Sequence, residues 1–179
     1  MDVKNWVFWL GSAWLMADFL TGVVHWIEDR YGNPDWPVLG KYVIQPNIRH
    51  HKDQRAFLEG SYLKRNWTTM LPTLSLAVLF YALGQPWLSL VAVFSSQANE
   101  VHGWAHQKCN RVIRALQLLG VFSSPEDHAT HHNKPFSTDF CVMSAVLNPV
   151  LELFLFWPTL ETVLGRLTGI WPRIEREQA

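Results

Sequence analysis

The sequence has little cysteine, no surplus of charge of either sign and no repetitive segment. Its two cysteines, Cys109 and Cys141, show neither C-x-x-C nor zinc-finger spacing, which argues against a disulfide framework and a thiolate metal site. We interpret both as packed free thiols. Lysine plus arginine and aspartate plus glutamate each total 15, without a block of like charge, so we expect no nucleic-acid partner. Without a linker or low-complexity tract, residues 1–179 are expected to form a single domain.

Apolar residues are abundant instead: 49% of the residues are hydrophobic and 17% are charged. Four apolar stretches stand out, at residues 6–27, 67–83, 86 to about 106, and 138 to about 164. The first has the roughly 20 residues that a helix needs to cross about 30 Å of hydrocarbon. The last is interrupted by two X-Pro pairs, so it either crosses once as a kinked helix or re-enters. We predict an all-α integral membrane protein with about four transmembrane helices.

Lysine and arginine gather in two segments, residues 28–66 and 107–137, whereas the N-terminus has only Lys4. By the positive-inside rule, both segments face the cytoplasm. This multi-pass topology places every histidine on the cytoplasmic side, either at the end of a predicted span or in a basic segment. The eight are His25, His50, His51, His102, His106, His128, His131 and His132. The sequence thus predicts a cytoplasmic histidine-rich cap that contains the active site.

The spacing of the histidines is typical of metal ligands carried by helices. Residues four apart share one face of a helix, so each such pair can present two ligand atoms to one centre. Three pairs have this spacing: His25 with Asp29, His102 with His106, and His128 with His132. Adjacent His50 and His51 point about 100° apart on a helix. They suit two different metals, or one ligand and one side chain that orients a ligand.

The number of nitrogen ligands favours a pair of metal ions. Eight histidines with Asp29 exceed the three or four protein ligands of a zinc site, and no sulfur set favours copper. A nitrogen-rich site that holds a redox-capable metal and is open to dioxygen indicates a non-haem di-iron centre. The alternative for any single histidine is an interfacial side chain without a metal. His25 and His51 can also orient a ligand by hydrogen bonding.

Two polar residues inside apolar stretches are candidates for supporting the ligands. Asp18 lies in the first stretch, where an ionised carboxylate costs roughly 2.5–3.5 kcal/mol on insertion scales. Helical spacing puts it on the face of His25 and Asp29, so it either supports the metal ligands or hydrogen-bonds to a neighbouring helix. Asn99 is either a similar support or an interhelical hydrogen bonder. No catalytic residue is predicted beyond the metal ligands.

Two other classes of membrane protein also use paired histidines. A b-type cytochrome places a haem between two histidines, but His102 and His106 share a helix face and most histidines lie outside the spans. A metal transporter is suggested by the intramembrane Asp18. Its ion path would need a second cluster across the membrane, and the sequence places all ligands on one side. A metal enzyme is the favoured interpretation.

The joint pattern of these motifs resembles the Kua family of lipid desaturases. The matching motifs are Ala17-Asp18-x2-Thr21-Gly22-x2-His25-Trp26-x2-Asp29, Arg49-His50-His51, Asn99-x2-His102-x-Trp104-x-His106, His128-x2-His131-His132-x2-Pro135, and Phe140-Cys141 with Asn148. They cover residues 14 to about 150. The family usually has Glu where Arg49 stands and Pro where Gln54 stands.

This resemblance implies an oxidoreductase that uses two iron ions and dioxygen to introduce a double bond into a membrane phospholipid. The eight histidines and Asp29 match the family's histidine motifs. Because the sequence shows no cytochrome b5, ferredoxin or flavin motif, we expect a separate electron-donor protein of the cytochrome b5 or ferredoxin type. The family includes plasmanylethanolamine desaturases, which form a vinyl ether, and an acyl desaturase. We favour the alkyl chain of an ether phospholipid as substrate, with acyl-chain desaturation as the alternative.

Overall fold

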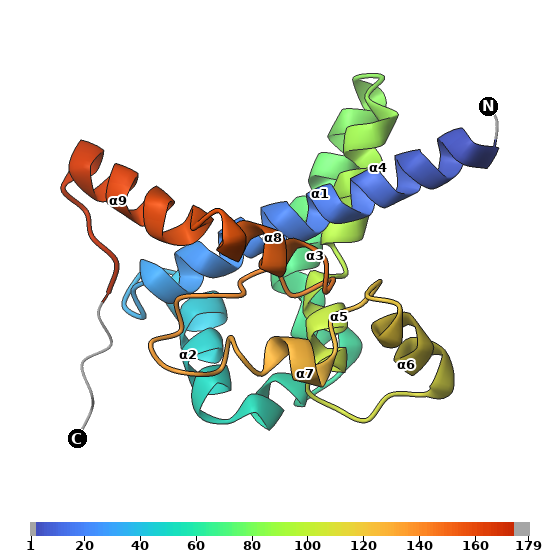
Figure 1. The fold of residues 1–179 in the computed structure, drawn as a ribbon. Helices are drawn as coiled ribbons and strands as arrows, with labels where there is room; N and C mark the ends of the chain where they lie inside the picture. The colour runs from blue at the N-terminus through green and yellow to red at the C-terminus, as the bar shows by residue number, and fades with distance from the viewer. Residues whose placement is uncertain (1–2, 174–179) are drawn as a thin grey trace.

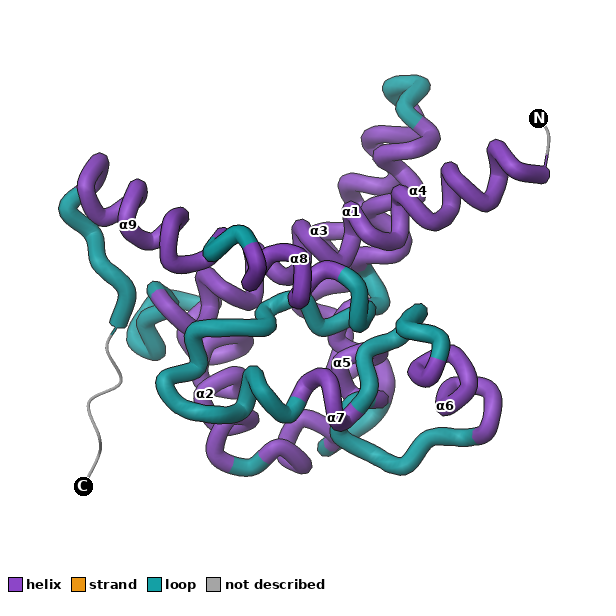
Figure 2. Tube along the Cα trace, viewed as in Figure 1, coloured by secondary structure: helices purple, strands orange, loops and turns teal. Residues whose placement is uncertain are grey.

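The computed structural model describes residues 3–173, which fold into helices and irregular segments without a strand (Figures 1 and 2). The predicted all-α class is therefore confirmed. In chain order the helices are α1 (Val3–Arg30), the π-helical turn η1 (Gly40–Ile44), α2 (Gln45–Lys52), the 3-10 turn η2 (Gln54–Leu58), α3 (Tyr62–Ala82), α4 (Pro86–Ser95), α5 (Ala98–Trp104), α6 (Arg111–Leu118), α7 (Pro125–His128), α8 (Leu147–Leu153) and α9 (Phe156–Thr168).

Helix α1 is the one described helix long and apolar enough to cross a membrane, over Lys4–Arg30. Only 22% of its most apolar window is buried against the rest of the protein, so most of its surface is available to lipid. Helix α3 has 21 residues but begins with a polar turn, and the apolar helix α4 has only 10. The expectation of about four membrane spans stays a prediction.

Two of the predicted apolar stretches are not single helices. The stretch that begins at Pro86 divides at residues 96–97, where α4 ends and α5 begins. The stretch from 138 to about 164 starts as an irregular loop, residues 138–146, and then forms α8 and α9, separated by Leu155 in a left-handed conformation (φ 50°). Pro149 and Pro158 lie in the first turns of α8 and α9, where proline is tolerated because those N–H groups have no helical partner.

Helices α3 and α4 form an antiparallel hairpin that packs against α1 (Figure 1). Gly84, with a positive φ of 70°, makes the turn, and Pro86 starts the second helix. Small residues on α1, Ala13 and Ala17, lie fully buried beside Val91 of α4. Their size lets the two backbones approach closely, as is common between membrane helices.

The 138–146 loop is held against α1 by buried polar contacts. Asp18 accepts hydrogen bonds from the Met143 N–H (2.8 Å), the Ser144 N–H (3.1 Å) and the Ser144 hydroxyl (2.6 Å). The Asn148 side chain accepts from the Cys141 N–H (3.0 Å) and donates to the Cys141 carbonyl (2.7 Å). These bonds satisfy backbone groups that an irregular buried loop would otherwise leave unpaired. The loop therefore has a fixed position along the face of α1.

Helix α9 is fixed to the end of α1 by a largely buried ion pair. The Arg30 Nε lies 2.7 Å from a carboxylate oxygen of Glu161, and Trp26 Nε1 donates to the same carboxylate at 3.2 Å. Trp26 also stacks on the buried Trp157, with ring centroids 5.9 Å apart. The last turns of α1 are thereby enclosed between α9 and the 138–146 loop.

We expect Gly22→Ala to destabilise the protein by about 1–3 kcal/mol through overpacking. A Cβ at Gly22 would lie 2.7 Å from Cys141 Sγ and 3.2 Å from the Cys141 backbone. Gly11→Ala is the matched control on the same helix, because a Cβ there has no atom within 4 Å. Thermal unfolding in detergent should show a loss for Gly22→Ala alone. Equal unfolding temperatures would contradict the close approach of the loop to α1.

Candidate metal centre

Four separate parts of the chain bring the histidines together. His25 and Asp29 lie in the last turns of α1, His50 and His51 on α2, and His102 on α5. His106 is the residue directly after the C-cap of α5. His128 is the last residue of α7, and His131 and His132 lie in the turn that follows it. All eight histidines and Asp29 belong to one of two groups whose candidate ligand atoms lie within 4.8 Å of one another.

The first group, called the five-histidine group, contains His50, His102, His106, His128 and His132. The Nε2 atom of His102 lies 2.8 Å from that of His128 and 3.1 Å from that of His106. The Nε2 atoms of His128 and His132 are 3.0 Å apart. Two nitrogens bound at about 2.1 Å to one ion lie about 3 Å apart when the bonds are at right angles, and about 3.4 Å apart in a tetrahedron. The spacing fits adjacent ligands of one ion.

Local structure explains how two of these pairs form. His102 and His106 are four residues apart, and the helical turn continues past Trp104 through a bond from the His106 N–H to the Gly103 carbonyl (3.1 Å). Helix α7 begins with a capping box between Ser124 and Asp127, which fixes the start of this short helix. His128 is its last residue, and His132 follows it by four residues. The predicted i,i+4 pairs are thus brought together.

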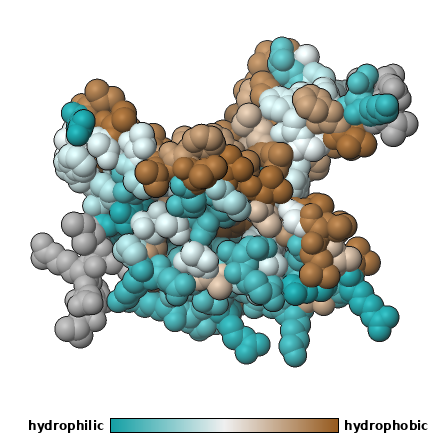
Figure 3. Space-filling view, in the orientation of Figure 1, coloured by the Kyte–Doolittle hydropathy of each residue, from teal (hydrophilic) through white to brown (hydrophobic). Residues whose placement is uncertain are grey.

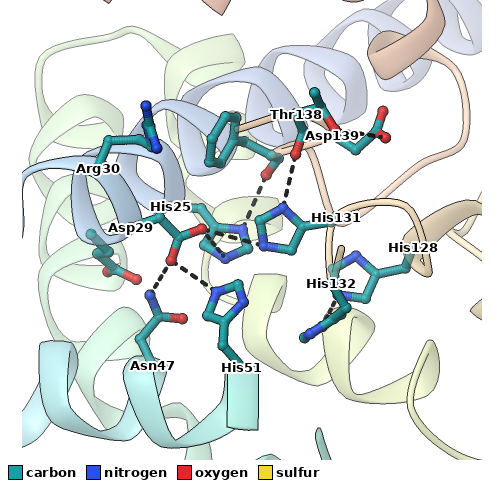
Figure 4. A network of polar contacts seen from close by, with 12 residues as sticks. His25, Asp29, Arg30, Asn47, His51, His128, His131, His132, Thr138 and Asp139 are labelled. Atoms are coloured by element: carbon teal, nitrogen blue, oxygen red, sulfur yellow. Dashed lines mark hydrogen bonds and ion pairs between the residues drawn. The ribbon is translucent and has the colours of Figure 1, made fainter. Parts of the chain in front are cut away.

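The second group, called the Asp29 group, contains His25, Asp29, His51 and His131 (Figure 4). Asp29 Oδ2 lies 3.4 Å from His25 Nε2 and 3.3 Å from His131 Nε2. Asp29 Oδ1 lies 3.0 Å from His51 Nε2 and also accepts a short hydrogen bond from the Asn47 amide. One carboxylate is therefore at the centre of three imidazoles.

Backbone carbonyls of the 138–146 loop orient two of these imidazoles. The Nδ1 of His25 lies 3.2 Å from the Phe140 carbonyl. The Nδ1 of His131 lies 2.9 Å from the Thr138 carbonyl (Figure 4). Each Nδ1 must carry the proton to donate these bonds, so each Nε2 has its lone pair directed at the centre of the group. Both Nε2 atoms and Asp29 Oδ2 are buried without a hydrogen-bond partner. Such atoms fit a bound cation.

The two groups adjoin. His50 and His51, neighbours on α2, contribute one imidazole to each group. The rings of His128 and His131 are 5.2 Å apart, and those of His25 and His102 are 5.5 Å apart, so imidazoles of the two groups are in contact. Ions held by both groups would be close neighbours, as in two-metal sites.

Three histidines of the five-histidine group are held neutral. Burial lowers the pKa of His50, His128 and His132, and the neighbouring histidines lower each pKa further, because a second positive charge would repel the first. Neutral imidazole is the form that binds a metal. The arrangement therefore favours an ion in place of protons.

The two predicted supporting residues bond elsewhere. The hydrogen bonds of Asp18 go to the 138–146 loop and those of Asn99 to the Arg65 carbonyl on α3 (3.0 Å), and neither side chain bonds to a described histidine. Asp18 instead bonds to the loop that also carries the Phe140 carbonyl, which contacts His25 Nδ1. Asn47, which the sequence reasoning missed, lies four residues before His51 on α2, so the same helical spacing could have found it. The Thr138 and Phe140 carbonyls leave no side-chain signal.

Residues 14–175 match a family model described as the lipid desaturase domain. The plasmanylethanolamine desaturase of Myxococcus xanthus is 30% identical over 171 residues, which cover 90% of this chain and 61% of the relative. Plasmanylethanolamine desaturase 1 of Mus musculus is 33% identical over 177 residues, with 90% and 65% covered. Fatty acid desaturase 4, chloroplastic, of Arabidopsis thaliana is 29% identical over 178 residues, with 90% and 52% covered. No solved structure matches.

The chain spans 61% to 65% of the length of the two plasmanylethanolamine desaturases. The matched region contains both histidine groups and the 138–146 loop.

If each group holds one ion, substitutions in different groups should each remove about one of two bound metals. His106→Ala changes only the five-histidine group and His51→Ala only the Asp29 group. We expect the double variant to lose both ions, measured as metal per chain by mass spectrometry of the purified protein. Cys109→Ala, which changes neither group, is the control. A double variant with its full metal content would contradict the assignment.

Asp18→Asn should lower stability by about 1–3 kcal/mol, because the amide keeps one acceptor and turns its NH2 toward donors. The metal content should be retained, since Asp18 bonds to the loop and to no described histidine. Thermal unfolding and metal analysis of the same preparation check both expectations. Complete loss of metal would instead indicate that Asp18 is a ligand.

Proposed function

Because the chain belongs to the lipid desaturase family, we propose that it is a dioxygen-dependent oxidoreductase that desaturates a membrane lipid at a non-haem di-iron centre. The observation that carries the proposal is the pair of adjoining ligand groups at the end of the one membrane-length helix among the described residues. The proposed substrate is the alkyl chain of an ether phospholipid, converted from the plasmanyl to the plasmenyl form.

The proposed ligands are the five histidines of the first group and the four residues of the Asp29 group. Nitrogen separations of 2.8 to 3.1 Å would let adjacent imidazoles of the five-histidine group hold one ion. Imidazole with a single carboxylate suits iron, and the two groups together offer more ligands than a zinc pair takes. The chemistry supplied by a bound iron pair is reduction of dioxygen to water as the lipid loses two hydrogens. A separate protein of the cytochrome b5 or ferredoxin type supplies two electrons.

The chain's own residues position the ligands and exclude water. The Phe140 and Thr138 carbonyls hold the Nδ1 protons of His25 and His131, which keeps both Nε2 atoms available. Asp29 contributes the one carboxylate and offsets part of the charge of bound cations. His50, His128 and His131 are almost fully buried, so the reacting carbons would meet the site away from bulk water.

The position of α1 supports a membrane location for the reaction. His25 and Asp29 lie within the last six residues of the span Lys4–Arg30, so the ligand groups lie at one face of the bilayer. We place this face in the cytoplasm because the connecting segments are rich in lysine and arginine. Multi-pass insertion by the α3–α4 hairpin belongs to the same proposal.

The names of two relatives favour the ether lipid as substrate, since both are plasmanylethanolamine desaturases. Acyl-chain desaturation is the alternative, because a relative named fatty acid desaturase 4 matches over the same share of this chain. A haem electron carrier is disfavoured by the packing. A haem with two axial histidines requires a porphyrin plane between them. The Nε2 atoms of the five-histidine group are too close together to leave that space.

Expression in cells that contain alkyl ether phospholipids should produce a lipid lighter by two hydrogens that breaks down in mild acid, as a vinyl ether does. Lipid mass spectrometry with and without acid treatment makes the measurement. His102→Ala should lose at least about a hundredfold of this activity, as expected when a metal ligand is removed. Lys64→Gln should keep it, because this exposed side chain lies outside both ligand groups.

An acid-stable product would replace the ether proposal with acyl desaturation. Full activity in His102→Ala would contradict the proposed centre. No lipid change with the wild-type chain, in cells that also express a suitable electron donor, would contradict the desaturase proposal.

A further inference from the structure

A cavity of about 830 Å³ opens beside the five-histidine group. Its walls come from η2, from the segment that follows α5, and from α6 and α7. Three of the proposed ligands, His106, His128 and His132, form part of the lining. The cavity is thus a route by which a small molecule can reach one proposed ion from outside the protein.

The cavity carries a surplus of positive charge. Arg55, Lys108 and Arg114 line it, and Glu126 is the carboxylate among the lining residues. Arg114 pairs with Glu126 at 3.2 Å, whereas the exposed side chains of Arg55 and Lys108 have no ion pair or hydrogen bond within residues 3–173. Two uncompensated cations in a concave site favour an anion, and phosphate is a common partner of Arg and Lys.

Helix α6 separates this cavity from an exposed apolar surface. Arg114 and Gln117 face the cavity, whereas Val112, Leu118 and Leu119 are 69%, 74% and 75% exposed. An amphipathic helix with a cation on one side and exposed apolar side chains on the other is typical of the membrane interface. Figure 3 shows apolar surface over the region of α6 and over that of α8, with a hydrophilic surface below both.

A contact with α1 sets the depth of α6. The Trp14 Nε1 donates to the carbonyl of Val121, in the turn after α6, at 3.0 Å. Trp14 lies near the middle of the span Lys4–Arg30, so the C-terminal end of α6 lies beside the apolar part of α1. The cavity itself is lined by His106, His128 and His132, whose group adjoins the Asp29 group at the end of the span, which is the level of lipid head groups.

We infer that this cavity binds the phosphate of the substrate lipid's head group, with Arg55 and Lys108 as the residues that contact it. The inference rests on the proposed function. In both candidate reactions the reacting carbons lie close to the glycerol unit, beside the ether oxygen or near the acyl carbonyl. The phosphate must then lie close to the metal ligands and not a chain length away. A cavity lined by unpaired cations and by three proposed ligands meets that requirement.

The test is lipid retention by the purified, detergent-solubilised full chain. One sample receives a 1-alkyl-2-acyl phosphatidylethanolamine, and another receives the same 1-alkyl-2-acylglycerol without the phosphate. Lipid that stays bound through gel filtration is quantified by mass spectrometry. We expect the wild type to retain more of the phospholipid than of the phosphate-free lipid. The double variant Arg55→Gln with Lys108→Gln should retain roughly tenfold less phospholipid than the wild type. Lys52→Gln with Lys64→Gln, a change of two exposed cations outside the cavity, should have no effect.

Competition and activity measurements distinguish a head-group site from a free-phosphate site and from a docking surface for the electron donor. Displacement of the lipid by millimolar inorganic phosphate alone would overturn the inference in favour of a free-phosphate site. Equal retention of the two lipids would also overturn it. So would a cavity variant that retains the phospholipid as the wild type does but whose metal centre is reduced more slowly by an acidic donor protein. The lipid product from the same cells tests the proposed function separately. Product formation by the wild type without phosphate-dependent retention would remove only the head-group site.

Discussion

Bringing eight imidazoles and one carboxylate into a single buried volume is the constraint on which the rest of this structure depends. Several of these nitrogens and oxygens have no hydrogen-bond partner, and each such buried atom costs about 1–3 kcal/mol unless something binds it. Protonation is opposed at His128 and His132, because burial and the neighbouring imidazoles both lower the pKa of these side chains. A cation in the Asp29 group would satisfy the Nε2 atoms of His25 and His131 and the Oδ2 atom of Asp29 together, so folding and metal binding are expected to be coupled.

The surrounding polar contacts make sense as supports for this arrangement. Asp18 and Asn148 contact no described histidine, yet they fix the loop whose carbonyls orient His25 and His131. Gly22 lets that loop lie directly on α1. The ligands thus depend on a rigid irregular segment as well as on helices. Support of this kind is typical of metal sites, in which hydrogen bonds behind the ligands fix their orientation.

Sequence reasoning found the ligand-type residues and their pairing because both follow from helix geometry. The i,i+4 pairs lie in common groups, and adjacent His50 and His51 point into different ones, as a rotation of about 100° per residue requires. It did not find the divided stretch at residues 96–97 or the irregular loop, since apolar composition alone does not distinguish a long helix from short buried segments. The Phe140 and Thr138 carbonyls were beyond reach, because any residue type can supply them. Membrane topology beyond α1 stays a prediction.

Mössbauer spectroscopy of the protein, produced with isotopically enriched iron, tests the central claim most directly. Our account predicts two non-haem, high-spin irons per chain that are magnetically coupled, because the two ligand groups share a boundary. A haem spectrum, or a single isolated iron in protein that carries its full metal content, would contradict it.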